Sequence, residues 1–369
     1  MAESNLITML IWLGELVVAS WALSYGAEYL SLKYGAKFIG RTFLSVATTL
    51  PEIAIVIYAA ATGSYDIAIG AGLGSNLLMM TLGLSLMLII ATTRLSKAPL
   101  KGIDVSTFKL DKVFLIITSI ASAVLFIDGY NYFDGFIFAG MFIAYFVLAL
   151  REMKVQRKKE ILTFRSNKDT RGYDENGDDN DSKGDFANFN VGHKPKSFDK
   201  QMIKAILIFV TGTIGILIGA EPFVHSLQGI SRDIGVSAVI LAVIISPIAG
   251  EMPEKISLMI LARKGTHGAS VAISNVLGSK ILNNTLLLAV AVFGAMVHAG
   301  FFSIIGNTSL LSYQMVLVTV VTIIALIPMF RREIGLTVGI MLALLYVISM
   351  GIQFMIPHEI TSTIRIHGS

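Results

Sequence analysis

Long apolar runs separated by short polar segments dominate the pattern of this chain. A helix that crosses a membrane needs about 20 mostly apolar residues. By that rule the sequence contains ten predicted spans, with the approximate bounds 5–25, 36–61, 66–91, 112–128, 134–150, 204–225, 235–262, 268–297, 312–330 and 333–356. The pattern therefore predicts an all-α integral membrane protein of about ten transmembrane helices.

A polar segment interrupts this pattern near the middle of the chain. Residues 151–203 begin with a basic stretch and continue into the acidic tract 174–181. The segment has too few apolar residues to form a core, so we expect a mostly disordered linker. The predicted organisation is a first five-helix unit over 1–150, the linker over 151–203, and a second five-helix unit over 204–369.

Composition supports the membrane assignment and limits the chemistry. The chain of 369 residues is 54% hydrophobic and 15% charged, against about 25% charged in soluble domains. It has no cysteine, which excludes disulfides and thiolate metal sites. The net charge of +4 is typical of basic cytoplasmic loops and does not indicate nucleic-acid binding. The first residues lack a basic region, so we expect the segment from Leu6 to be a span and not a cleaved signal peptide.

Lysine and arginine alternate between loops in a way that predicts the topology. The basic loops are those near 26–41, 92–112, 151–204, 263–264 and 331–332, whereas the loops around 62–66, 128–134 and 298–311 have no Lys or Arg. The positive-inside rule then places the linker in the cytoplasm and both termini outside, in a prokaryotic plasma membrane. Because each unit has an odd number of spans, the two units take opposite orientations.

The two units also share a series of short motifs in the same order. Gly26-Ala27-Glu28 corresponds to Gly219-Ala220-Glu221, and a Pro-Glu pair follows in each unit. The stretch 72–76 (GLGSN) then corresponds to 276–280 (VLGSK). Three matching motifs in the same order indicate that the two halves are homologous, so the sequence predicts two inverted five-helix repeats.

Each Pro-Glu pair lies inside an apolar run. The pairs are Pro51-Glu52 and Pro253-Glu254. A glutamate in the middle of a span is costly and persists mainly where it faces a cavity, a partner or a cation. Proline breaks a helix and frees backbone carbonyls. A broken helix with a mid-membrane carboxylate, present twice, is typical of a transporter's ion site.

Further oxygen-bearing residues lie one helical turn from these glutamates or from each other. Residues three or four apart share a helix face. This spacing relates Thr48 and Thr49 to Glu52, Glu251 to Glu254, and Ser279 to Asn283; Ser75 has Met79 at the same spacing. Hard cations such as Ca²⁺ take about 6–8 oxygen ligands, so a divalent cation is the predicted ligand.

These motifs resemble the sodium/calcium exchanger family of the cation/Ca²⁺ antiporter superfamily, over nearly the whole chain except the linker. The resemblance implies ten helices, alternating access by sliding of the first and sixth helices, and an ion site formed by the second, third, seventh and eighth. It implies that Glu52 and Glu254 bind Ca²⁺ and help to bind Na⁺. The implied hydroxyl ligands are Thr48, Thr49, Ser75 and Ser279, and the implied backbone carbonyl ligands fall near Ser45 and Pro247.

The chain departs from the family pattern at several ion-site positions. In the second unit the two hydroxyl positions before the motif are Gly250 and Glu251. The position that is Asn283 in the second unit is Met79 in the first, and a thioether is a poor ligand for hard cations. Lys280 follows Ser279, and Lys255 follows Glu254. Two interpretations of Glu251 stay open: a metal ligand, or the partner of one of these lysines.

The function predicted from the sequence is Ca²⁺/Na⁺ antiport by alternating access, with inorganic cations and the lipid bilayer as partners and one monomer as the working unit. Because the Na⁺ positions are altered, the first alternative is exchange of Ca²⁺ or another divalent cation for H⁺. A cation channel is the alternative from another class. The sequence offers no phosphate loop, catalytic triad order or zinc motif, so we do not expect an enzyme.

Overall fold

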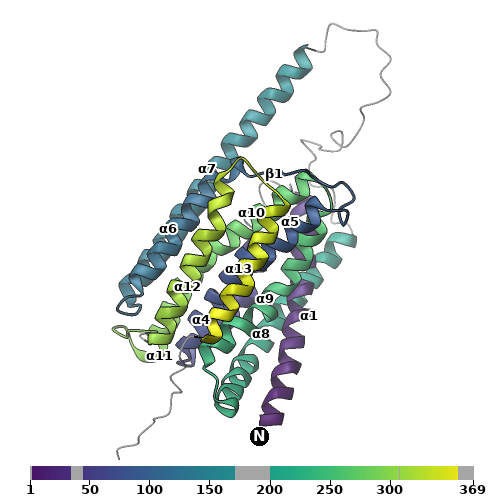
Figure 1. The fold of residues 1–369 in the computed structure, drawn as a ribbon. Coiled ribbons are helices and arrows are strands. Elements are labelled where there is room, and N and C mark those ends of the chain that lie inside the picture. Colours follow the sequence, from purple (N-terminus) through teal and green to yellow (C-terminus); the bar gives the residue numbers. More distant parts are fainter. Residues whose placement is uncertain (1, 35–44, 171–199, 307, 356–369) are drawn as a thin grey trace, which may run out of the picture.

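The computed structural model describes residues 2–34, 45–170, 200–306 and 308–355, and it is almost entirely helical (Figure 1). The elements of the first half are α1 (Ala2–Tyr34), α3 (Leu50–Ala61), α4 (Tyr65–Leu78), η1 (Met79–Gly83), α5 (Leu84–Thr92), β1 (Ile103–Asp104), η2 (Ser106–Phe108), α6 (Lys109–Leu125) and α7 (Tyr132–Thr170). Those of the second half are α8 (Lys200–Ile234), α9 (Ala238–Ala262), α10 (Thr266–Leu282), η4 (Asn283–Leu287), α11 (Leu288–Ala299), α12 (Ser309–Leu326), η5 (Ile327–Phe330), β2 (Glu333–Ile334) and α13 (Leu336–Met355).

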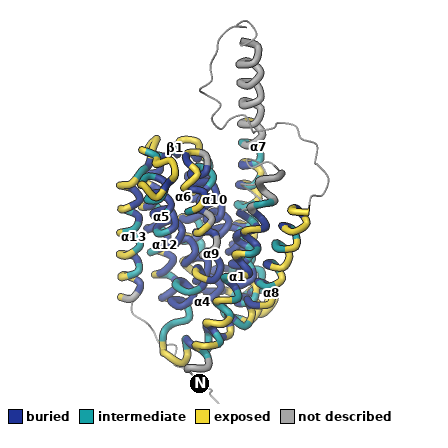
Figure 2. Tube along the Cα trace, turned by 90° about the vertical axis from the view of Figure 1, so that its right-hand side faces the viewer, coloured by how far each residue is buried: buried dark blue, intermediate teal, exposed yellow. Residues whose placement is uncertain are grey.

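Seven of the described helical stretches are long and apolar enough to cross a membrane, and α3 and the first part of α9 are shorter apolar helices. Apolar side chains cover much of the outer surface of the bundle, among them Trp21, Ile214 and Val347. The interior helices are α4 and α9, which Figure 2 shows as largely buried. A bundle with an apolar exterior fits a lipid surround, as the hydropathy pattern predicts.

Two predicted segments differ from the structure at one of their ends. Residues 151–170, expected to begin a disordered linker, continue helix α7 to Thr170. Their many Lys, Arg and Glu residues are good helix formers, and helix propensity does not require apolar residues. Residues 333–334, expected at the start of the last span, form β2 and pair antiparallel with β1. The acidic tract 174–181 lies outside the described residues.

Helices α1 and α8 pack against each other along nearly their whole length, in opposite directions. At one end Asn5 Nδ2 donates to Asp233 Oδ2 at 2.7 Å, and at the other Tyr29 Oη donates to Gln201 Oε1 at 2.9 Å. Between these ends Gly212 allows close approach, since a Cβ atom there would lie 2.6 Å from Ala19 O. The pair is thus a two-helix unit held together by small residues.

The prolines affect the two motif helices differently. In the first half a turn at Thr49 interrupts the helix and α3 begins at Leu50, with Pro51 in its first turn, as a broken helix requires. In the second half α9 is continuous from Ala238 to Ala262, so the predicted break is absent there. The helix persists because each proline removes only one hydrogen bond, and neighbouring helices approach the freed carbonyls.

Neighbouring helices lie close to both freed carbonyls of α9. Pro247 leaves Val243 O without a helical donor, and α4 approaches so closely there that a Cβ atom on Gly74 would lie 2.0 Å from that oxygen. Pro253 leaves Ala249 O without a helical donor, and Ser20 Oγ of α1 donates to it at 3.3 Å. The prolines thus help to define where α4 and α1 cross α9.

We expect the substitution Gly74→Ala to disrupt the crossing of α4 and α9. The added methyl group overlaps the backbone of Val243, which cannot move as a side chain can, so the cost is about 2–3 kcal/mol or more. The measurement is the yield of monodisperse protein and its melting temperature in detergent. The matched control is Gly140→Ala on α7, where a Cβ atom meets nothing within 4 Å. Equal stability of the two variants would contradict the proposed close contact.

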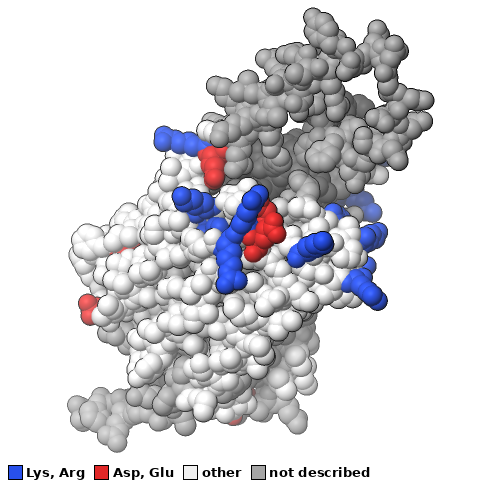
Figure 3. Space-filling model, turned by 45° about the horizontal axis from the view of Figure 1, so that its top comes forward, with Lys and Arg blue, Asp and Glu red and all other residues white. Residues whose placement is uncertain are grey.

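The end of the bundle that carries β1 and β2 is basic. Figure 3 shows Lys and Arg side chains gathered there. The exposed basic residues of the β1 and β2 region and the neighbouring loops are Arg94, Lys97, Lys101, Lys109, Arg263, Lys264, Arg331 and Arg332. The extension of α7 projects from this end, and the N-terminus lies at the opposite end (Figure 1).

Candidate functional site

Helices α3, α4, α9 and α10 bring the two Pro-Glu motifs together inside the bundle. Glu52 lies in the first turn of α3 and is 3% exposed, and Glu254 on α9 is 2% exposed. The Glu52 carboxylate lies directly against α9, because a Cβ atom on Gly250 would be 2.6 Å from Glu52 Oε1. The glycine that replaces a predicted hydroxyl position therefore makes room for the carboxylate of the other motif.

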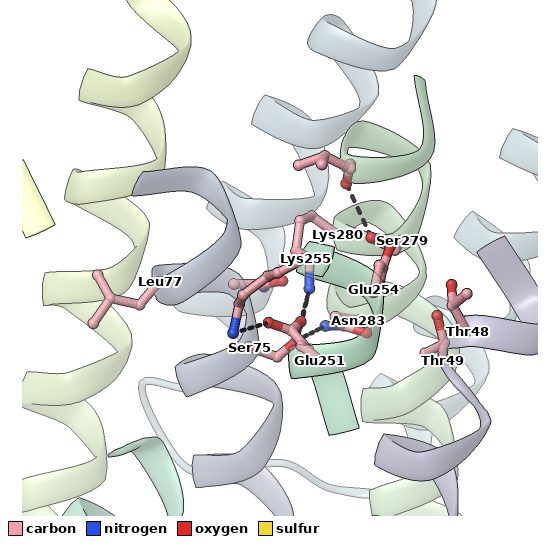
Figure 4. Close-up of polar contacts among 12 residues, drawn as sticks. Thr48, Thr49, Ser75, Leu77, Glu251, Glu254, Lys255, Ser279, Lys280 and Asn283 are labelled. Carbon is pink, nitrogen blue, oxygen red and sulfur yellow. Dashed lines mark hydrogen bonds and ion pairs between the residues drawn. The ribbon is translucent and has the colours of Figure 1, made fainter. Parts of the chain in front are cut away.

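Glu251 is the centre of a second buried cluster (Figure 4). Its Oε1 forms an ion pair with Lys280 Nζ and accepts a hydrogen bond from Ser75 Oγ. Its Oε2 lies 4.0 Å from Lys255 Nζ, and the three charged side chains are at most 5% exposed. Of the two interpretations that the sequence leaves open, the ion pair is the arrangement in this structure.

Asn283 extends this cluster, as its spacing from Ser279 suggests, but it contacts Ser75 on the facing helix. Its amide nitrogen lies 2.5 Å from Ser75 Oγ. The opposite orientation of the amide satisfies its neighbours better: the oxygen then accepts from Lys280 Nζ at 3.2 Å, and the nitrogen donates to Ser279 O at 3.3 Å. Ser75, Asn283 and Glu251 thus form one polar group around the Lys280 ammonium.

The predicted hydroxyl ligands Thr48, Thr49 and Ser279 bond to the backbone of their own helices. Thr48 Oγ1 and Thr49 Oγ1 donate to Ser45 O at 3.2 and 2.7 Å, and Ser279 Oγ donates to Val276 O at 3.1 Å. In Figure 4 the two threonines lie apart from the Glu251 cluster. Ser45 O, a predicted carbonyl ligand, is therefore already accepting from both threonines.

The remaining predicted positions are buried. Pro247 lies on α9 one turn before Glu251. Met79 is fully buried at the start of η1, and its sulfur lies beside Gly83, where a Cβ atom would be 2.9 Å from it. The sulfur thus packs within its own helix.

Asn275 belongs to the site although the sequence analysis did not select it. Its Nδ2 donates to Glu254 Oε1 at 2.7 Å, and its Oδ1 accepts from Ser45 Oγ at 2.9 Å. It thereby connects α10 to Glu254 and to the segment before α3. Asn275 precedes Ser279 by four residues, so the i,i+4 rule could have found it. It was missed because the equivalent position in the first half is Ala71.

Several charged atoms of the site lack a hydrogen-bond partner among the described residues. With all five buried side chains ionised, the three negative charges of Glu52, Glu251 and Glu254 and the two positive charges of Lys255 and Lys280 sum to one net negative charge. Within the described residues, Glu52 Oε2, Glu251 Oε2 and Lys255 Nζ have no hydrogen-bond partner. Glu251 Oε2 and Lys255 Nζ lie 4.0 Å apart as an ion pair, whereas Glu52 Oε2 has no such partner among the described residues. A buried carboxylate oxygen without a hydrogen bond is costly, so Glu52 has unused capacity to bind a cation.

The acidic side chains alone do not form a metal cage. Among the residues that the structure describes, no three His, Cys, Asp or Glu side chains cluster closely enough to hold a metal ion. A cation bound at Glu52 and Glu254 would complete its shell with amide, hydroxyl and backbone oxygens or water, as Ca²⁺ sites commonly do.

Comparison with known proteins defines the class of this membrane protein. The model of the sodium/calcium exchanger protein family matches residues 4–151 and 204–355, which is most of the chain. The chain therefore belongs to the sodium/calcium exchanger family, a family of membrane antiporters that exchange Ca²⁺ for other cations.

Particular relatives are distant. An uncharacterized membrane protein of Methanocaldococcus jannaschii is 25% identical over 312 residues, 85% of each chain. The fold is similar to the crystal structure of the H⁺/Ca²⁺ exchanger CAX, with a TM-score of 0.73 and 20% identity over 96% of this chain and 82% of that one. It is also similar to the sodium-calcium exchanger NCX_Mj, with a TM-score of 0.57 and 22% identity over 95% of this chain and 99% of that one.

Proposed function

We propose that this antiporter exports Ca²⁺ in exchange for Na⁺ by alternating access, with the cation held between the Pro-Glu motifs of α3 and α9. The observation that carries the proposal is the pair of buried carboxylates, Glu52 and Glu254, on helices that meet at Gly250. Buried carboxylates in a membrane protein mark ion pathways by default. Oxygen ligands in a dry interior favour a hard cation over any apolar or anionic substrate.

The ion shell would combine side chains from both halves of the chain. Glu52 and Glu254 would supply carboxylate oxygens, and Ser45 a backbone oxygen. Thr48, Thr49 and Ser279 would add hydroxyl oxygens by small rotations, and the α9 turn near Pro247 would add a freed carbonyl, whereas Ser75 and Asn283 face the Lys280 ammonium. Asn275, which now holds Glu254, would orient that carboxylate toward the ion.

We further propose ten spans in two inverted five-helix repeats. A π-helical turn follows the Gly-Ser motif in each half: η1 begins four residues after Ser75, and η4 four residues after Ser279. Paired irregularities of this kind at equivalent positions support a duplicated unit. The long contact between α1 and α8, made through small residues, suits a pair that slides as a unit against the other helices.

The basic end of the bundle supports one membrane orientation. We propose that the β1–β2 end and the 151–203 linker face the cytoplasm, with both termini outside, because Lys and Arg gather at that end (Figure 3). One copy of the chain contains both motifs, so a monomer suffices for transport.

The coupling ion is tested by ⁴⁵Ca²⁺ uptake into proteoliposomes at clamped voltage. We expect an outward Na⁺ gradient to drive Ca²⁺ uptake, and an outward H⁺ gradient of the same size to drive less uptake. The competing H⁺ function is favoured by the engagement of Glu251 with Lys280, which removes one carboxylate from Na⁺ binding. Uptake driven by H⁺ alone would show that the coupling ion is H⁺ and not Na⁺. Uptake at a channel's rate without any counter-ion would contradict antiport.

Lys255→Met is expected to tighten Ca²⁺ binding by about tenfold or more. Lys255 Nζ is buried without a hydrogen-bond partner in the described structure, and its charge opposes a cation at the adjacent glutamates. At an effective dielectric constant of about 20, such a charge several ångströms away is worth more than the roughly 1.4 kcal/mol of a tenfold change. The measurement is the Ca²⁺ concentration for half-maximal uptake. Lys264→Met, at an exposed loop position, is the control. An unchanged or higher half-saturation for Lys255→Met would contradict this electrostatic role.

A further inference from the structure

The Lys280 ammonium is surrounded by oxygen atoms in the way that a metal cation would be. Glu251 Oε1 forms an ion pair with it, Ser75 Oγ accepts from it at 2.6 Å, and Asn283 Oδ1 faces it at 3.2 Å in the satisfied orientation of that amide. These are a carboxylate, a hydroxyl and an amide oxygen, the donor types that hard monovalent and divalent cations take in proteins.

The three oxygens come from three different helices. Glu251 is on α9 and Ser75 on α4, and Asn283 begins η4 directly after the helix that carries Lys280. All are at most 3% exposed, so the group is closed to solvent in this conformation. In the first half the position equivalent to Lys280 is Asn76, an uncharged residue that donates to Asn284. The charge at position 280 is therefore a feature of one half only.

From this geometry we propose that the Lys280 ammonium is a built-in cation that permanently occupies a monovalent-cation position formed by Glu251, Ser75 and Asn283. The proposal rests on the proposed transport function for its consequence. Because Lys280 is covalently attached, the positive charge in this position cannot be released with the transported ions. The protein then uses one coupling cation fewer per Ca²⁺ than it would with a neutral side chain at 280.

Charge counting supports this role. With Lys280 present and all five side chains ionised, the three glutamates and two lysines of the site sum to one negative charge. Removing the ammonium leaves two, with Glu251 Oε1 and Ser75 Oγ free to bind an ion from solution. A bound Na⁺ would restore the original sum, in the space that the lysine side chain vacates.

The test compares Na⁺ binding by variants at position 280 in detergent, without any transport step. Melting temperatures of wild type and Lys280→Asn are measured in NaCl, LiCl and KCl against choline chloride at constant ionic strength. A ligand that binds only the folded state raises stability with the logarithm of its concentration. We expect the stability of Lys280→Asn to rise more steeply with log[Na⁺] than that of wild type. The difference between the two slopes should correspond to one additional bound Na⁺.

Two further variants serve as controls. Lys280→Arg keeps the internal cation, and Glu251→Gln/Lys280→Gln removes the cation together with its carboxylate ligand. Both are expected to keep the wild-type Na⁺ dependence. If Lys280→Asn is recovered from membranes only in buffers that contain Na⁺, Li⁺ or K⁺, that rescue also supports the proposal.

Two results would overturn the proposal. One is a folded Lys280→Asn protein whose salt dependence equals that of wild type. The other is failure to recover Lys280→Asn in any salt while Glu251→Gln/Lys280→Gln folds. Where uptake is measurable, the reversal potential should give one more coupling cation per Ca²⁺ for Lys280→Asn. If wild type moves no Ca²⁺ under any gradient, the transport function fails, but the melting comparison still decides the role of position 280.

Discussion

Glu52→Gln and Glu254→Gln are each expected to reduce Ca²⁺ uptake by at least about 100-fold, to the level of empty liposomes. Each substitution removes one of the two carboxylates on which the proposed ion site depends, and keeps the size and polarity of the side chain. In a buried site the lost attraction for a divalent cation exceeds about 3 kcal/mol, which corresponds to more than 100-fold in affinity. The measurement is ⁴⁵Ca²⁺ uptake by reconstituted protein at equal protein density.

The fold is expected to survive both substitutions. Glu52 Oε2 has no hydrogen-bond partner in the described structure, so a neutral amide at that position loses no such bond there. The Asn275 bond to Glu254 is kept if the new amide presents its oxygen. Glu333→Gln on β2, exposed at the basic end, is the control for the substitution itself. Uptake near the wild-type level in either motif variant would remove that glutamate from the site.

The second large effect is on stability. Glu251→Gln is expected to destabilise the protein by about 3–5 kcal/mol, because it leaves the Lys280 ammonium buried without its counter-charge. Lys280 is only 1% exposed and lies in the last turn of α10, which continues directly into η4 and α11, so it cannot extend to water without unfolding a helix. The measurement is the melting temperature in detergent at low ionic strength.

The double variant Glu251→Gln/Lys280→Gln is expected to recover most of this loss. Replacing both members of a buried ion pair by neutral groups is often nearly neutral, in contrast to removal of one member. Additive destabilisation in the double variant would show that the pair contributes nothing as a pair. A stable single variant Glu251→Gln would contradict the ion pair directly.

Helix positions were largely accessible from the sequence because the membrane imposes a simple rule on length and hydropathy. The apolar segments near 204–225 and 312–330, for example, lie within α8 and within α12 with η5. Features that depend on contacts between helices could not be predicted from the sequence. The contacts at the two carbonyls that the α9 prolines free are made by Gly74 and Ser20, which lie on other helices. Low hydrophobicity alone does not predict the helical start of the linker, 151–170, because helix propensity does not require apolar residues.

The candidate site was predictable in its residue types but not in its pairing. Mid-membrane position singled out Glu52 and Glu254, and both are buried at the junction of α3 and α9. Sequence spacing places Glu251 near Glu254 on one helix, but it says nothing about which facing helix supplies its partner. The ion pair with Lys280, 29 positions away, is visible only once α9 and α10 are packed.

The most direct test of the central claim is to locate a bound divalent cation. Crystals of the protein soaked in SrCl₂, with Sr²⁺ as a heavy substitute for Ca²⁺, would give an anomalous difference map. We expect one strong peak between the carboxylates of Glu52 and Glu254, which NaCl in excess weakens and which Glu52→Gln abolishes. A strong peak at the exposed basic end or in the lipid-facing surface, with none between α3 and α9, would contradict it.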